Sequence, residues 1–524
     1  MKRILAMVAI CACVLSTLAD VVTYPAPAGE PESQDYEVHV NGRKVFCYTS
    51  FHVVNDEFYR PFFPDRKEMK VKGRPVSPMT FCYFDFQGEV EVKVKMLKAL
   101  EGDGIKRTGA VVRPLGLGIH PKMKGHEFTF TITKPGQITI EAGGAWIRPL
   151  HVFANPMEVD PPKDGDPGVL YFGPGNHEVD LIRLQSNQTV YIAGGAIVHL
   201  KADPTPEKLP KLTKMGLPMR RRQYGICGLN EENVAIRGRG IFCERRSLLA
   251  DQTAGGIRAQ NMRDLRIEGI IMREATGWTV NVVNSKNVHI DNVKVVGHYV
   301  GNDGILLGGT SDALVENCFL NNSDDSFEVK CWALPMRNVE FRNCIAWSNS
   351  GTCFGLSGEC NNDVDNVAFR NCTVIHDLND VASRGVIGVH VNGPGNVSNF
   401  LFEDIVIEHV PSKRRPSLKV FNNWSHWHNR LEAKPGKPYE RLQNTYPKDE
   451  NGAAIHPGTI TNVTFRNVRV LEAANDDVVI MADGPQSPIR GVILDNVSIN
   501  GREVRPGDPR IKSNGHVSEV TVRE

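Results

Sequence analysis

The chain lacks an excess of charge of either sign, and beyond its N-terminus it lacks any long apolar run. It has 61 Lys and Arg residues against 60 Asp and Glu residues, which gives a formal net charge of +1 over 524 residues. This balance argues against a nucleic-acid-binding protein, which needs a basic face to neutralise phosphates. Because 41% of the residues are hydrophobic, the chain can build a large core and is not mainly disordered.

Residues 1–19 are expected to be a cleavable secretory signal. Lys2 and Arg3 precede an apolar run over Ile4–Leu15, which is too short to cross a bilayer, and small residues predict cleavage after Ala19. An uncleaved anchor and a lipoprotein modified at Cys13 are the alternatives. No later stretch is apolar over 18 residues, so we expect no membrane span and a secreted or periplasmic protein.

Metal-binding cysteine pairs are also missing. Two of the 12 cysteines lie in the expected signal, and no Cys-x-x-Cys pair occurs after it. We therefore expect no zinc site, and no motif indicates another metal or a cofactor. Export permits disulfides, and Cys353 and Cys360 are candidates for closing a short loop.

Residues 20–157 are expected to form an N-terminal β-sandwich. Tyr36–Val40, Glu89–Val94 and Glu127–Thr133 alternate polar and apolar residues, which is typical of antiparallel strands with one solvent-facing side. Two such sheets packed together are the simplest way to bury the apolar sides. Residues 158–168 are rich in Pro, Asp and Gly and are interpreted as a linker.

Residues 169–524 contain a repeated strand motif that predicts a right-handed parallel β-helix, so the expected fold class is all-β. Asn287–Asn292, Asn338–Asn343 and Asn366–Asn371 each begin with Asn-Val and end with Asn. Related motifs recur at intervals of 23 to 33 residues, with one interval of 63. One coil cannot bury its own apolar face, but stacked coils form a continuous core. A leucine-rich repeat would need Leu-x-x-Leu-x-Leu, which is absent.

The repeat also predicts where particular residues lie. The recurring asparagine is expected to stack on its equivalents in a turn of the coil. Cys318, Cys344 and Cys372 follow this asparagine in three successive coils and are expected to form an interior ladder of free thiols. The 63-residue interval predicts an insertion at residues 411–457.

Three aspartates are candidate catalytic residues. Asp303 lies in Gly301-Asn-Asp-Gly304, and Asp324 and Asp325 begin 21 residues later, about one coil away. Stacked strands lie about 4.8 Å apart, so the three carboxyl groups are expected to cluster on one outer face. Clustered carboxyl groups raise one another's pKa, which can keep one protonated as a general acid beside ionised bases. Polar turns and a Ca²⁺ site are the alternatives.

These motifs resemble those of the polygalacturonase clan, which comprises glycoside hydrolase families 28 and 49. The resemblance covers most of residues 169–524, including Tyr171–His177, Leu184–Val190, Tyr191–Ala196 and Gly277–Val280. An N-terminal β-sandwich before the helix is similar to the dextranase and isopullulanase family, number 49. The resemblance implies a carbohydrate substrate and hydrolysis with inversion of configuration.

The resemblance also implies roles for individual residues. Asp324 would protonate the leaving oxygen, and Asp303 and Asp325 would hold and deprotonate the attacking water. Lys330 matches a frequent family position, and a solvated lysine at a strand end is the alternative for it.

The chain departs from family 28 at positions where that family contacts substrate. Asn302 stands where the family usually has Thr, and Phe354 stands where it has His. The stretch that carries Arg-Ile-Lys in the family holds Arg384 and His390 here. These two residues are candidates for partly replacing the paired Arg and Lys of the family. Paired cations suit a uronate carboxylate, so their loss favours a neutral or differently charged glycan.

Further side chains are candidates for substrate contact. Trp424 and Trp427 lie in the expected insertion, where aromatic rings can stack on sugars or, alternatively, plug the insertion onto the helix. Trp278, His298 and Glu359 lie on or near the coils of the carboxylate motifs, and His298 is alternatively a turn or surface residue.

The sequence therefore predicts a secreted, inverting glycoside hydrolase that acts on a polysaccharide or oligosaccharide through three aspartates. A β-helix polysaccharide lyase or epimerase is one alternative, although no obvious Arg/Lys cluster accompanies the motifs. A non-catalytic glycan-binding solenoid is the other, although binding alone does not require three apposed carboxyl groups.

Overall fold

A computed structural model of the chain describes residues 20–53, 69–71, 74–97, 100, 107–203, 223–246, 254–299, 301–380, 382–423, 431–432, 440–441 and 446–524. The expected signal and both candidate tryptophans of the insertion, Trp424 and Trp427, lie outside these residues. Over the described residues the fold is nearly all-β, and the short 3-10 helix η2 spans Leu115–Leu117. In the described part of the chain, no helix has the length and apolarity needed to cross a membrane.

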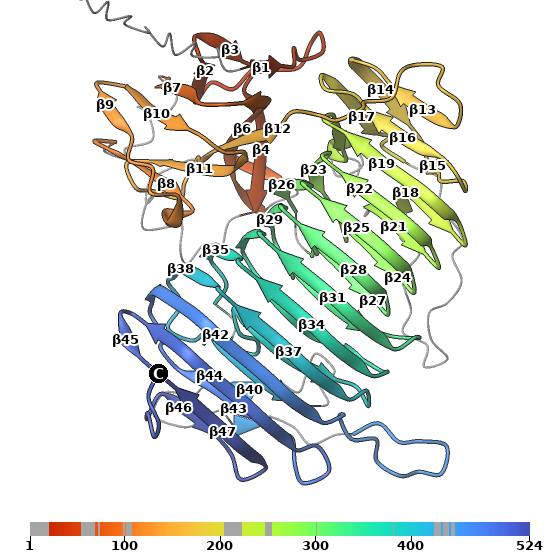
Figure 1. Cartoon of the computed structure of the whole chain (residues 1–524), viewed down its shortest axis with the longest axis vertical. Helices are drawn as coiled ribbons and strands as arrows, with labels where there is room; N and C mark the ends of the chain where they lie inside the picture. Colours follow the sequence, from red (N-terminus) through yellow and green to blue (C-terminus); the bar gives the residue numbers. More distant parts are fainter. Residues whose placement is uncertain are drawn as a thin grey trace, which may run out of the picture.

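The region after residue 168 is a parallel β-helix, as the repeat predicts (Figure 1). Each regular coil contributes one strand to each of three parallel rows. One row is an 11-stranded sheet made of β15 (Ile182–Arg183), β18 (Gln223–Leu229), β21 (Ala254–Gln260), β24 (Val280–Val283), β27 (Ile305–Gly308), β30 (Phe327–Cys331), β33 (Phe354–Cys360), β36 (Ile387–Asn392), β39 (Leu418–Asn422), β43 (Val478–Met481) and β46 (Ile511–Ser513).

The other two rows belong to one large sheet. The first contains β13 (Val169–Phe172), β16 (Thr189–Ile192), β19 (Glu232–Gly238), β22 (Arg263–Glu268), β25 (Lys286–Asp291), β28 (Ser311–Glu316), β31 (Met336–Arg342), β34 (Val364–Arg370), β37 (Val397–Glu403), β42 (Ile460–Ala473), β44 (Ile489–Ile499) and β47 (Val517–Arg523). The second contains β14 (Gly175–Val179), β17 (Ala196–Leu200), β20 (Ile241–Cys243), β23 (Ile271–Ala275), β26 (Lys294–His298), β29 (Phe319–Asn322), β32 (Ile345–Ser348), β35 (Thr373–Asp377) and β38 (Val406–Val410), and it continues into β42. β45 (Arg502–Glu503) pairs antiparallel with β44, and β40 (Leu431–Glu432) pairs with β41 (Glu440–Arg441).

The recurring asparagines stack along the helix. Asn343 donates its side-chain amide to Asn317 at 3.1 Å, and Asn371 donates to Asn343 at 2.8 Å. All three have positive φ, a conformation that asparagine tolerates better than most residues. The sequence motif therefore encodes both the turn and the contact between successive coils.

The interior of the helix is apolar. Cys318, Cys344 and Cys372 are buried free thiols, and the Cys344 amide donates to the Cys372 sulfur at 3.4 Å. The disulfide considered for Cys353 and Cys360 is wrong, because both are free thiols. Cys353 immediately precedes the extended strand β33, and Cys360 is its last residue. Seven extended residues span roughly 20 Å, whereas disulfide-bonded residues lie within about 7 Å.

The N-terminal region forms two packed layers. One is a five-stranded antiparallel sheet of β3 (Arg43–Val45), β2 (Tyr36–Val40), β7 (Val90–Met96), β10 (Glu127–Ile132) and β9 (Lys122–Lys124). The other comprises β1 (Asp20–Thr23), β4 (Tyr48–Val53), β5 (Met69–Val71), β6 (Arg74–Gln87), β8 (Ala110–Arg113), β11 (Gly136–Ala142) and β12 (Leu150–Pro156). Val92 and Phe128 of the first layer share an apolar cluster with Phe84 and Ile140 of the second.

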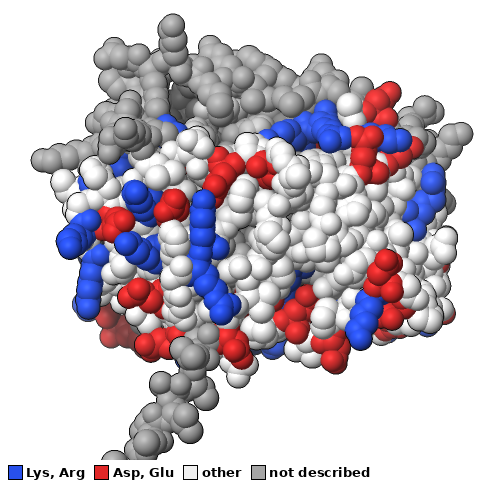
Figure 2. Space-filling view, turned by 90° about the horizontal axis from the view of Figure 1, so that it is seen from above, with Lys and Arg blue, Asp and Glu red and all other residues white. Residues whose placement is uncertain are grey.

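The N-terminal layers pack along the side of the β-helix (Figure 1). Phe81 and Phe153 join Phe319 and Trp347 of the helix in one buried cluster. Residues 157–168 carry no strand; the linker at 158–168 and the N-terminal domain at 20–157 stay proposals. Within the proposed insertion at 411–457, β39 still continues the 11-stranded sheet. Acidic and basic side chains are interspersed over the face seen in Figure 2.

Candidate active site

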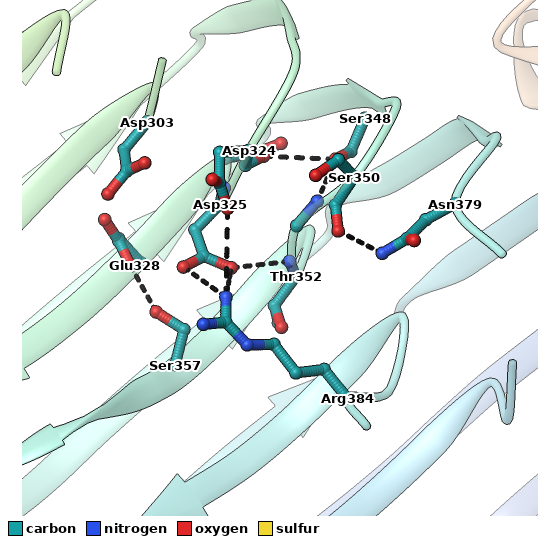
Figure 3. Close-up of polar contacts among 12 residues, drawn as sticks. Asp303, Asp324, Asp325, Glu328, Ser348, Ser350, Thr352, Ser357, Asn379 and Arg384 are labelled. Atoms are coloured by element: carbon teal, nitrogen blue, oxygen red, sulfur yellow. Dashed lines mark hydrogen bonds and ion pairs between the residues drawn. The ribbon is translucent and has the colours of Figure 1, made fainter. Parts of the chain in front are cut away.

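The three predicted aspartates lie together at the N-terminal ends of two neighbouring strands (Figure 3). Asp303 precedes β27, and Asp324 and Asp325 precede β30; these strands pair in parallel with Ile305 opposite Phe327. The Gly304 amide, next to Asp303, donates to the Asp325 carbonyl at 2.8 Å. Asp303 and Asp325 therefore occupy equivalent positions of successive coils, which explains their proximity.

Asp325 is buried and held as a carboxylate. Arg384 Nη1 lies 2.7 Å from both of its oxygens, and the Thr352 amide donates to Oδ1 at 2.7 Å. Burial alone would raise the pKa of Asp325, but the charges of Arg384 and Lys330, together with these hydrogen bonds, lower it to about 2. Asp325 is thus ionised at any ordinary pH.

Asp324 has the opposite character. Its side chain is 30% exposed, and its Oδ1 accepts the Asp325 amide at 3.0 Å. Desolvation, reinforced by the negative charges of Asp303 and Asp325, raises the pKa of Asp324 to about 7. A carboxyl group with this pKa carries a proton over the acidic range and can donate it near neutral pH.

Lys330 is the central cation of the site. It extends from β30, is only 4% exposed, and its Nζ lies 3.2 Å from carboxylate oxygens of Asp303, Glu328 and Glu359. Burial would lower the pKa of Lys330, but the surrounding carboxylates raise it well above its usual value. The lysine is therefore a buried partner of the carboxyl groups, unlike the solvated lysine considered as an alternative.

A metal ion does not suit this cluster. Carboxyl oxygens of Asp303, Asp325 and Glu328 lie within 4.8 Å of one another, a spacing that could hold a cation. Lys330 Nζ, however, lies 3.2 Å from two of these groups and 3.9 Å from the third. A charged ammonium group has no lone pair for a metal, and it already neutralises the oxygens.

The turn that carries Arg384 is itself braced by the next coil. Arg415 donates to the Arg384 carbonyl at 3.3 Å and forms a buried ion pair with Asp377 at 2.8 Å. Lys419 Nζ donates to the carbonyls of Ala382 and Ser383 at 2.7 and 2.9 Å. These contacts fix the guanidinium against Asp325, so the structure gives Arg384 an internal partner where sequence reasoning considered a substrate contact.

Replacing Arg384 distinguishes these two roles. In Arg384→Met, Asp325 loses its bidentate partner inside a buried site, so its pKa should rise. We expect kcat to fall by about 100-fold, as for a lost charge-assisted contact, and the acidic limb of the pH profile to move to higher pH. Arg414→Met, which removes an exposed arginine 3.7 Å from Asp380, is the control. A raised KM for acidic glycans alone, with an unchanged pH profile, would instead assign Arg384 to substrate binding.

The remaining predicted residues divide between the site and its supports. Glu359 is one-third exposed and contacts Lys330. Trp278 stacks on Trp332 with ring centroids 5.8 Å apart, and Lys330 Nζ lies 5.0 Å from the centre of the Trp278 ring. Asn302 is fully buried: its Oδ1 accepts the Ser323 amide at 2.8 Å, so it braces the turns that carry the aspartates.

Two predicted histidines lie in other environments. His298 is fully buried against the N-terminal region, where it stacks on His52 and lies 3.1 Å from the Asn349 amide nitrogen. It is therefore not a surface residue. His390, on β36, stacks on Phe421 at 4.0 Å, and burial lowers its pKa to about 3, so the ring is neutral. Phe354, at the position of the family histidine, packs in the core against Phe327.

Sequence reasoning missed Glu328. Its side chain is fully buried beside Asp303, and the Ser357 hydroxyl donates to its Oε2 (Figure 3). Strand alternation offered a signal, because Glu328 and Lys330 must share a face of β30 and both follow the Asp-Asp motif.

Comparisons with known proteins bear on the family and the fold. Residues 244–414, which include all three aspartates, match the model for glycosyl hydrolases family 28. The exopolygalacturonase clone GBGE184 of Arabidopsis thaliana is 22% identical over 268 residues, which are 50% of this chain and 55% of the relative. The chain thus spans about half the length of that curated relative.

A solved structure extends the fold comparison to nearly the whole chain. Dex49A from Penicillium minioluteum superposes with a TM-score of 0.61 at 13% identity, covering 95% of this chain and 96% of that one. At this identity the likeness concerns the fold, including the region before the β-helix. The family 28 match over residues 244–414 and this likeness in fold both agree with the resemblance to the polygalacturonase clan of glycoside hydrolases.

Proposed function

We propose that the protein hydrolyses glycosidic bonds of a polysaccharide or oligosaccharide with inversion of configuration. The observation that carries this proposal is the difference between two adjacent carboxyl groups. Asp324 has a pKa of about 7, whereas Arg384 holds Asp325 ionised with a pKa of about 2. An acid and a base with separated pKa values are what glycoside hydrolysis requires.

The proposed reaction assigns one proton transfer to each side of the sugar. Asp324, partly exposed, donates its proton to the leaving glycosidic oxygen as the bond to the anomeric carbon breaks. Asp303 and Asp325 bind a water molecule, whose oxygen attacks the anomeric carbon while its proton passes to a carboxylate. The proton then returns to Asp324 through solvent, which restores the site.

The charges of the site favour a neutral sugar at the point of cleavage. Both cations of the described cluster are already paired with carboxylates: Lys330 with Asp303 and Glu359 at 3.2 Å, and Arg384 with Asp325 at 2.7 Å. Glu359 adds a negative charge at the partly exposed edge. A uronate carboxylate would have to compete for these cations, so we propose a neutral glycan, in contrast to the substrate indicated by the name of the exopolygalacturonase relative.

A substrate panel with product analysis tests this function. Purified protein would be incubated with neutral glycans, polygalacturonan and rhamnogalacturonan, and reducing-end release would be followed. Proton NMR during early turnover should show the anomer opposite to that of the cleaved bond. Retention of the anomer, or an unsaturated product with new ultraviolet absorbance, would contradict inverting hydrolysis; the latter would indicate a lyase. Preferred cleavage of polygalacturonan would contradict the neutral glycan.

The proposed function also concerns where the protein acts. Polysaccharides are too large to enter a cell freely, and the first 19 residues have the composition of a secretory signal. We therefore propose a secreted or periplasmic enzyme.

A further inference from the structure

Glu328 is a buried carboxyl group for which the mechanism above has no role. It lies on β30 between the Asp-Asp motif and Lys330, and its side chain is fully buried. Its Oε2 lies 3.2 Å from Lys330 Nζ and accepts the Ser357 hydroxyl. Its Oε1 is equally buried and has no hydrogen-bond donor among the described residues. An ionised carboxylate buried in this way would leave one oxygen without a donor, which is costly.

The neighbour of this carboxyl group is another carboxyl group. Oxygens of Glu328 and Asp303 belong to a set that lies within 4.8 Å, and the two side chains lie next to each other in Figure 3. Two ionised carboxylates are both acceptors and repel each other, whereas one shared proton turns the same contact into a hydrogen bond. Burial raises the pKa of Glu328 well above its usual value; the negative charges of Asp303 and Asp325 and the hydrogen bond to Asp303 act in the same direction, against the charge of Lys330.

The charges around Glu328 point to the same protonation state. The charged groups around Glu328 and its partner Lys330 come from four elements. They are Asp303 before β27, Asp325 and Lys330 on the turn and strand of Glu328 itself, Glu359 on β33, which contacts Lys330, and Arg384 before β36. With Asp324 protonated, an ionised Glu328 would set four carboxylates against two cations in a largely buried cluster. A neutral Glu328 leaves three, and Glu359 among them is one-third exposed to solvent.

We infer that Glu328 is a neutral carboxylic acid that donates a hydrogen bond to Asp303 and thereby positions Asp303 for the attacking water. This role rests on the proposed function, but the protonation of Glu328 does not. Glu328 is a positioning residue: together with Lys330, which donates to Asp303 Oδ2 at 3.2 Å, its proton fixes the orientation of the Asp303 carboxylate beside the attacking water. Asp325 accepts hydrogen bonds from Arg384 on both oxygens and from the Thr352 amide, so we assign the proton of that water to Asp303.

Infrared difference spectroscopy of the resting protein tests the protonation directly. At about pH 8.5, above the pKa of Asp324, spectra of wild-type protein and Glu328→Gln should differ by one carbonyl band of a protonated carboxyl group. The band should persist in Asp324→Asn, which separates the two acids. Absence of the band from the difference spectrum would overturn the inference whatever the protein hydrolyses.

Two variants test the positioning role. The amide of Glu328→Gln can still donate to Asp303, whereas Glu328→Met has a similar shape and no donor. We expect Met to lower kcat by about 100-fold and Gln by roughly ten-fold or less, with a smaller effect on KM. If Glu328 instead served as a charged partner of Lys330, both variants would lose activity equally, which would refute the role. Glu340→Gln on the exposed face of β31 is the matched control, and thermal unfolding would verify that each variant folds.

Discussion

Replacing Asp324 by Asn should lower kcat by about 10³-fold or more on natural glycans while leaving the fold intact. The loss follows because an amide cannot supply the proton that the leaving oxygen needs, and general acid catalysis contributes roughly 10²–10⁴ to such reactions. The fold should persist, since the carbonyl oxygen of the new side chain can still accept the Asp325 amide that Asp324 accepts at 3.0 Å. Initial rates on the glycan found by the substrate panel would measure the effect.

The leaving group gives this prediction its sharpest test. An activated aryl glycoside leaves without protonation, so Asp324→Asn should lose far less activity on it than on the natural bond. The matched control is Asp312→Asn on β28. Asp312 accepts a hydrogen bond from the side-chain amide of Asn338 in the next coil, and an asparagine at this position can accept the same bond. Equal losses on both substrates would mean that Asp324 is not the proton donor, and unchanged turnover would remove it from the mechanism.

The pH profile provides an independent check of Asp324. The reaction needs Asp324 protonated, and its pKa is about 7, so kcat/KM should fall as the pH rises through 7. Asp325, with a pKa of about 2, stays ionised across the accessible acidic range and should not limit activity there. In Asp324→Asn, the decline above pH 7 should disappear from the residual activity.

Local repetition explains what the sequence revealed. The asparagine motif recurs once per coil, so its spacing alone predicts the stacked strands and the ladder from Asn317 through Asn343 to Asn371. The same spacing brings Asp303 beside Asp325, because residues one coil apart become lateral neighbours. In a solenoid, contacts between successive coils are nearly local in sequence, and patterns can find them.

Contacts that skip coils or join domains could not be read in this way. Arg384 reaches Asp325 across 59 residues, and no repeat places it there. His298 is buried because β4 of the N-terminal region lies against β26, a packing that no local pattern encodes. The strand pattern alone allowed Lys330 to be a solvated lysine. In the structure, Lys330 is buried because it contacts the carboxyl groups of Asp303 and Glu328.

Acidification to pH 5 should strongly destabilise the contact between the N-terminal region and the β-helix. Trp347 lies at this contact with its ring 5.8 Å from His52, 5.9 Å from His151 and 4.6 Å from His376. All three histidines are fully buried. Burial, together with the charge of neighbouring histidines, lowers the pKa of His52 and of His151 to about 3. Nearby His409, also buried, has a pKa of about 3 for the same reasons.

The direction of the effect follows from proton linkage. In the unfolded chain histidine rings bind protons below about pH 6.5, whereas in the folded protein His52, His151 and His409 stay neutral until the pH approaches 3. Their contribution to stability is therefore intact above pH 6.5 and is lost progressively as the pH falls below it. At pH 5 the loss is about 2 kcal/mol for each such histidine, a large share of a typical folding free energy.

The variant His151→Phe isolates one of these contributions. Phenylalanine keeps an aromatic ring beside Phe153 and Phe319 but binds no proton, at the cost of the contact between His151 Nδ1 and the Thr139 hydroxyl at 2.9 Å. Urea unfolding at pH 7 and pH 5 should show that the stability lost between the two conditions is about 2 kcal/mol smaller in this variant than in the wild type. His39→Phe on β2, where the side chain is 31% exposed, is the control and should leave that difference unchanged. The same loss in His151→Phe and wild type would show that acid acts on the protein elsewhere, since the buried ring would then take up no proton on unfolding.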